Sequence, residues 1–148
     1  NLVLQVDNWD YWNDPDNNPM QYSFPLKTSE ISFSPAVIAS NSFEYNMFNR
    51  VFIDVNSKYV GKQFIDMSGS EDRKLNPYSV SDIILYIPVK SKFTQDINFS
   101  FTLANIFNKK YISNAWVYRY FENNAEKRTD GFFPQAGTHF LAGINFKF

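Results

Sequence analysis

The sequence predicts an all-β fold, an antiparallel up-and-down meander of about five or six strands. Apolar and polar residues alternate at period two along several segments, and no segment shows a helical stripe over three turns. Links rich in Asn, Asp, Gly, Ser and Pro separate these segments. The alternation is typical of a soluble β-sandwich and equally of a membrane β-barrel.

The predicted strands follow one another along the chain, each with an apolar side and a mostly polar side. The last is the clearest, because four apolar residues from Phe140 to Phe146 share one parity while His139, Asn145 and Lys147 share the other. From the N-terminus, the predicted strands are a stub at Leu2 to Val6, then Phe43 to Met47, Val51 to Tyr59, Ile83 to Val89, Ile97 to Asn105 and Thr138 to Phe148.

The links between the predicted strands alternate between short and long. Short turns are expected near Asn49 and Ser91, whereas Asp7 to Pro35, Asp66 to Pro77 and Tyr120 to Pro134 are expected to be long polar loops. Outer-membrane barrels combine short periplasmic turns with long extracellular loops. A last strand of about 35 Å, tilted by about 45°, would rise about 25 Å, which matches their apolar band. Link and strand lengths therefore favour the barrel.

Composition excludes several other functions. The net charge is -1 and the pI is about 5.8, so no nucleic-acid partner is expected. With no Cys and one His, thiolate and histidine metal clusters are excluded. Asp14 and Asp16 have calcium-loop spacing, but Pro19 and Pro25 replace the Gly and Glu of an EF-hand. No metal site, no cofactor and no catalytic residue is expected, because no nucleophile accompanies the carboxylates.

Three motifs and the chain terminus carry a family resemblance. The motifs are Ser57 to Phe64 (SKYVGKQF), Asn105 to Tyr111 (NIFNKKY) and Phe132 to Gly143 (FFPQAGTHFLAG), and the terminal residues are Phe146 and Phe148. Together they resemble the C-terminal region of the TonB-dependent outer-membrane receptors found in Bacteroidota, and Phe146 and Phe148 are similar to the C-terminal barrel-insertion signal of such proteins.

The resemblance implies that residues 1–148 are part of a transmembrane barrel of about 22 strands in the bacterial outer membrane. The chain is expected to begin in mid-protein, without the plug domain and the first strands, and to leave open edges at Leu2 to Val6 and Thr138 to Phe148. The implied function is uptake of a ferric siderophore or haem-like chelate, with cobalamin or another nutrient as the alternative. Implied partners are outer-membrane lipid, lipopolysaccharide, the insertion machinery, the rest of the barrel, the plug, the nutrient, and TonB through the missing N-terminal region. A secreted β-sandwich that binds carbohydrate is the alternative from another class.

The candidate site residues fall into two groups. Loop aromatics and cations are the candidates for ligand binding, and one parity of the strands is expected to face the membrane. Trp116 and Tyr118 belong to the loop aromatics, although packing on neighbouring strands is the more ordinary role for them. The ligand-binding candidates are Trp9, Trp12, Arg73 and Arg119, and the membrane-facing candidates are Phe99, Phe101, Leu103, Phe140, Ile144 and Phe146.

Overall fold

The computed structural model describes residues 3–5, 9–12, 21–24, 28–48, 50–90, 96–122 and 125–147. Every regular element in these ranges is a β-strand, and none of their residues forms a helix long and apolar enough to cross a membrane. The chain divides into two compact units. We call Val37–Val60, Tyr78–Tyr111 and Gln135–Phe148 the sheet unit, and Asn1–Ala36, Gly61–Pro77 and Ile112–Pro134 the loop unit.

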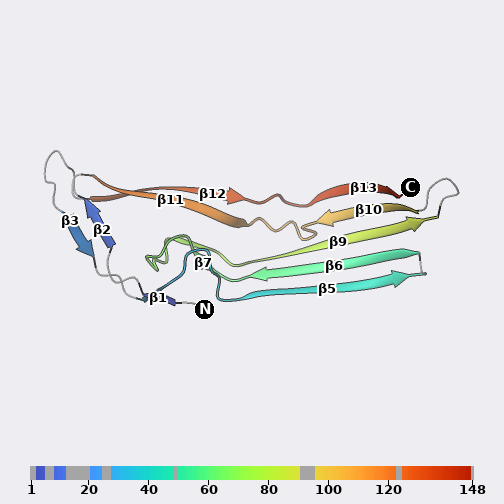
Figure 1. Ribbon diagram of the computed structural model, residues 1–148, viewed down its shortest axis with the longest axis horizontal. Coiled ribbons are helices and arrows are strands. Elements are labelled where there is room, and N and C mark those ends of the chain that lie inside the picture. The colour runs from blue at the N-terminus through green and yellow to red at the C-terminus, as the bar shows by residue number, and fades with distance from the viewer. Residues whose placement is uncertain are drawn as a thin grey trace. The chain divides into compact units, whose positions relative to one another are not determined.

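The sheet unit contains one five-stranded antiparallel sheet. Its spatial order is β13-β10-β9-β6-β5, so its strands are neighbours in the order in which the chain makes them (Figure 1). This confirms the predicted all-β, up-and-down arrangement. The strands are β5 (Ile38–Met47), β6 (Val51–Val60), β9 (Tyr78–Val89), β10 (Asp96–Ala104) and β13 (His139–Lys147).

The register of the sheet places the apolar residues that alternate along each of the five strands on one face. Paired residues of antiparallel strands point to the same side, so each chain of pairs across the sheet forms a row. One row is Phe43, Val55, Ile83, Leu103 and Phe140. The apolar face comprises Phe43, Tyr45, Met47, Val51, Ile53, Val55, Ile83, Leu85, Ile87, Val89, Ile97, Phe99, Phe101, Leu103, Phe140, Ala142, Ile144 and Phe146. The six residues predicted to face a membrane all belong to it.

The opposite face of the sheet is mostly polar. A representative row is Glu44, Asp54, Ile84, Thr102 and Leu141. Apolar side chains interrupt this face without covering it, as the sequence indicates. The two faces therefore differ strongly in polarity, and we call this one the polar face.

The sheet is open at both ends. Its outer strands are β13 and β5, and no further strand pairs with either of them within the described residues. The edge predicted at Thr138 to Phe148 agrees with β13. The edge predicted at Leu2 to Val6 is wrong, because β1 (Val3–Gln5) pairs with β4 (Thr28–Glu30) in the loop unit and β5 takes the edge position.

Asn105 joins the end of β10 to the start of β13. Its side chain is almost fully buried, and its Nδ2 donates to the carbonyl oxygens of Lys109 at 2.9 Å and Ala136 at 3.0 Å. Its Oδ1 accepts from Lys109 N, and its carbonyl accepts from Thr138 Oγ1 at 2.7 Å. Asp82 of β9 accepts from Asn105 N at 2.7 Å. A single residue thus ties the end of β10 to Asp82 within β9 and to the residues just before β13.

The backbone of Asn105 is left-handed, with φ at 51°. Asn tolerates this conformation better than most residues, because its short amide can bond to nearby backbone groups. The motif from Asn105 to Tyr111 is therefore explained locally, as a turn that one amide side chain holds together.

The loop unit contains four small antiparallel pairs. Among the described residues of this unit, besides β1 and β4, these are β2 (Trp9–Trp12) with β3 (Gln21–Phe24), β7 (Gln63–Phe64) with β8 (Lys74–Leu75), and β11 (Ile112–Glu122) with β12 (Ala125–Pro134).

The prediction of a polar loop from Tyr120 to Pro134 is wrong, because β12 occupies most of it. The sequence of β12 is AEKRTDGFFP, whose charged residues hide the alternation that would predict a strand. A small core of Ile65, Leu75 and Ala115 supports β11.

Replacing Asn105 with Ala should lower the free energy of unfolding by about 3 kcal/mol, because buried backbone groups lose their partners. Asn105→Gly should be about 1 kcal/mol less damaging than Asn105→Ala, since glycine adopts positive φ without strain. Asn98→Ala, on an exposed position of β10, is the matched control and should change it by less than about 0.5 kcal/mol. Urea titration measures all three, and equal effects at Asn98 and Asn105 would contradict this role.

Candidate functional site

The β11/β12 hairpin carries the most distinctive side-chain arrangement in the loop unit. Its register pairs Trp116 with Gly131, Tyr118 with Thr129 and Tyr120 with Lys127, after an irregularity between Ile112 and Asn114. The irregularity shifts the register once, so all residues beyond it keep a constant alternation of faces. We call the side with Asn114, Trp116, Tyr118, Tyr120, Lys127, Thr129, Gly131 and Phe133 the aromatic face.

Trp116 lies flat across the hairpin. A Cβ atom built on Gly131 would stand 2.0 Å from Trp116 Nε1 and 2.3 Å from Cε2, so the indole occupies the space that any side chain at 131 would need. Trp116 nevertheless remains 47% exposed. One side of the indole therefore rests on the partner strand and the other side is open.

The tyrosines extend this surface along β11. Tyr118 is 63% and Tyr120 40% exposed, and their ring centroids lie 5.8 Å apart at an interplanar angle of 33°. Together with Trp116 they form a row of three rings at successive positions of one face. The packing on a neighbouring strand that the sequence analysis expects is present at Trp116, which lies against Gly131 of β12, and Trp116 and Tyr118 both keep an exposed side.

The opposite side of the hairpin holds cations that are bound to carboxylates. Asp66 Oδ2 lies 3.1 Å from Arg73 Nη1 and 3.5 Å from Arg119 Nη1, and all three side chains are largely buried. Arg128 binds Asp72 at 2.8 Å and Asp130 at 2.9 Å. The structure thus brings the candidates Arg73 and Arg119 together, and it places an aspartate between them.

The segment from Lys62 to Lys74 adds an exposed charge cluster. Hydrogen bonds from Lys74 and then Lys62 lower the pKa of Glu71 from 4.5 to about 2. The same contact with Glu71 raises the pKa of Lys62, whose ammonium also lies 5.0 Å from the centre of the Phe64 ring. Hydrogen bonds from Ser70 and then Arg128 lower the pKa of Asp72. These shifts come from mutual pairing, so the charges largely neutralise one another.

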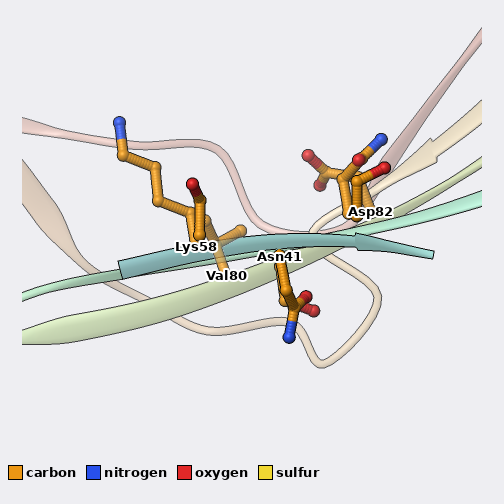
Figure 2. Close-up of a pocket in the computed structure, with 8 residues that line it drawn as sticks. Asn41, Lys58, Val80 and Asp82 are labelled. Atoms are coloured by element: carbon orange, nitrogen blue, oxygen red, sulfur yellow. The ribbon is translucent and has the colours of Figure 1, made fainter. Parts of the chain in front are cut away.

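An open groove with a volume of about 360 Å³ lies on β5, β6 and β9 of the sheet unit. Figure 2 shows Lys58 and Asp82 on one side of these strands and Asn41 on the other. Ser57 and Ser81 join the central strands by an Oγ to Oγ hydrogen bond of 2.8 Å. Its lining residues are Ser40, Asn41, Ser42, Asn56, Ser57, Lys58, Val80 and Asp82. The groove straddles the edge strand, so it does not enclose a ligand.

Some sequence-based candidates lie outside the described residues. These are the side chains of Trp9 and Trp12, the terminal Phe148 and the acidic loop from Asp14 to Asn18. Among the described residues, no group of three or more His, Asp or Glu side chains is placed to hold a metal ion.

Two residues of the hairpin environment were not identified from the sequence. Gly131 makes room for the indole, and Asp66 holds the two arginines. The sequence feature that could have indicated Gly131 is the presence of a glycine among the charged residues of β12. Asp66 is far from Arg119 in sequence, so only the fold reveals that pair.

Asp66→Asn should lower the free energy of unfolding by about 3 kcal/mol, because it leaves two largely buried guanidinium groups without their shared carboxylate. Glu71→Gln removes a carboxylate that also has two cationic partners, but its side chain is 62% exposed, and it should have a far smaller effect. Urea unfolding of both variants makes the comparison. A loss at Asp66 no larger than at Glu71 would show that Asp66 does not organise this region.

No family model, no curated protein and no solved structure matches the chain.

Proposed function

We propose that the sheet unit is a segment of the wall of an outer-membrane β-barrel, and that the chain belongs to a TonB-dependent receptor for a scarce nutrient. The observation that carries the proposal is the apolar face, which continues across all five strands without a polar residue. Lipid-facing surfaces of such barrels have this composition, with the other parity directed to a polar lumen. The function proposed is binding and transport, without catalysis.

Exposure of the apolar face supports a lipid environment. Phe99 and Phe101 lie on β10, which is paired on both sides, and they are still 39% and 40% exposed. At the edge strand β13, Phe140 is 69% and Ile144 53% exposed. Soluble monomers rarely expose continuous apolar surface of more than a few hundred Å². Lipid tails would cover this surface without a second protein layer.

The boundaries of the apolar face also fit a membrane. A nine-residue strand such as β13 is about 30 Å long and rises about 23 Å at a tilt of about 40°. One end of the face is marked by a polar row on three strands, where aligned residues replace the apolar ones. This row is Asn41, Ser57 and Ser81 of β5, β6 and β9. Beyond it Tyr59, 41% exposed, stands where an interfacial aromatic ring is expected.

The open edges and the motifs support the proposal further. A sheet in lipid must pair every edge, so β5 and β13 would be joined to other strands of a barrel of about 22 strands. The motif from Asn105 to Tyr111 anchors β13, which gives its resemblance to the receptor family a structural role. Lipid, lipopolysaccharide, the plug domain, TonB and the insertion machinery are the partners that this proposal implies.

Lipid contact predicts different effects for two neighbouring substitutions. Phe101→Arg places a guanidinium in the middle of the apolar face and should cost about 2 to 4 kcal/mol when the intact protein folds into phosphatidylcholine vesicles. Thr102→Arg points to the polar face and should cost clearly less. Equal costs at both positions would indicate two packed faces, as in a soluble sandwich.

The receptor function predicts a growth defect. Deletion of the gene should abolish growth when one nutrient is limiting, and the gene should restore growth only in cells with an active TonB system. The nutrients to compare are ferric siderophores, haem, cobalamin and neutral oligosaccharides. Normal growth of the deletion strain on every one of them would contradict the proposal.

A further inference from the structure

We propose that the aromatic face of the β11/β12 hairpin binds a neutral oligosaccharide, with Trp116 as the stacking platform. The proposal rests on geometry within the loop unit. Only the step from binding to uptake depends on the proposed receptor function.

The shape of the face fits a sugar ring. The indole of Trp116 is held flat by the backbone at Gly131, and one side of the ring is open. A pyranose presents a flat patch of C–H groups, which packs on an aromatic ring and excludes water from both surfaces. The rings of Tyr118 and Tyr120 continue in the same direction, so consecutive sugar units would find consecutive rings.

Polar groups border the rings as a sugar would require. Thr129 is paired with Tyr118, Lys127 with Tyr120, and Asn114 lies two residues before Trp116 on the same face. Hydroxyl, amide and ammonium groups can exchange hydrogen bonds with sugar hydroxyls around the stacked ring. The two tyrosine hydroxyls add to this set.

Charge on the hairpin argues for a neutral ligand. An anionic chelate is recognised by arginine forks, but Arg119 and Arg128 lie on the other side of the hairpin and are bound to carboxylates. Lys127 is the single charged residue of the aromatic face as defined above. A ligand with hydroxyl groups and little charge therefore matches this face better than a ferric chelate.

Tryptophan fluorescence of the intact protein in detergent tests the proposal. Residues 1–148 contain three tryptophans, so a Trp9→Phe, Trp12→Phe double variant leaves Trp116 as the one indole of this part of the protein. The probes are maltohexaose, cellohexaose and xylohexaose, with ferric citrate as the anionic chelate. At least one hexasaccharide should give a saturable change in emission, and ferric citrate should give none.

Variants then locate the site. Tyr118→Ala and Tyr120→Ala should each weaken binding about tenfold, whereas Tyr118→Phe should retain most of it because the ring remains. Phe132→Ala is the matched control, an aromatic residue of similar exposure on the opposite side of the hairpin, and should leave affinity unchanged. Both tyrosines are exposed, so these variants are expected to fold.

Three results would overturn the proposal: no saturable response to any hexasaccharide, equal affinity in the tyrosine variants, or a response to ferric citrate alone. None of them bears on whether the sheet unit enters lipid, which the Phe101 and Thr102 variants decide. Sugar binding by a protein that stays monomeric without detergent would instead identify a soluble carbohydrate-binding module.

Discussion

The register of β13 against β10 is the constraint on which the two-faced sheet depends, and the buried amide of Asn105 holds it. Even-numbered residues of β13 pair with odd-numbered residues of β10. A slip by one residue would turn His139, Asn145 and Lys147 to the apolar face and Phe140 to the polar one. The bonds from Asn105 to Ala136 and Thr138 fix the chain just before β13 begins. The Asn105 side chain thereby fixes which residues of β13 lie on the apolar face and which lie on the polar face.

Both units consist of β-strands, but they differ in which side chains they bury. In the sheet unit, apolar side chains gather on an exposed face and few residues are buried. In the loop unit, β11 and β12 rest on a small core and on ion pairs that link them to the segment from Asp66 to Asp72. Burial there stabilises a platform whose other side remains open. Under the two proposals, the sheet unit would contact lipid and the hairpin would present its rings to a ligand of the same receptor.

Period-two alternation made most of the sheet predictable, because a strand with one apolar side has a single workable register. The same rule failed for β12, where Arg128 and Asp130 take part in ion pairs that the sequence does not reveal. It also failed at β5, whose first half from Ile38 to Ser42 is mostly polar and adds no apolar stripe. The rings of the candidate site were predictable as loop aromatics, but their flat, open presentation depends on Gly131, a contact across the hairpin that only the fold shows.

The central claim, that the apolar face contacts lipid, can be measured along one strand. Residues 1–148 contain no cysteine, so once any cysteine elsewhere in the protein is replaced, single cysteines from Ile97 to Leu103 can each carry a nitroxide spin label in vesicles. Collision with oxygen, which concentrates in lipid, should peak at positions 97, 99, 101 and 103, and collision with a water-soluble nickel complex should be higher at 98, 100 and 102. Odd positions shielded from both reagents would contradict the account, because they would lie in a protein core.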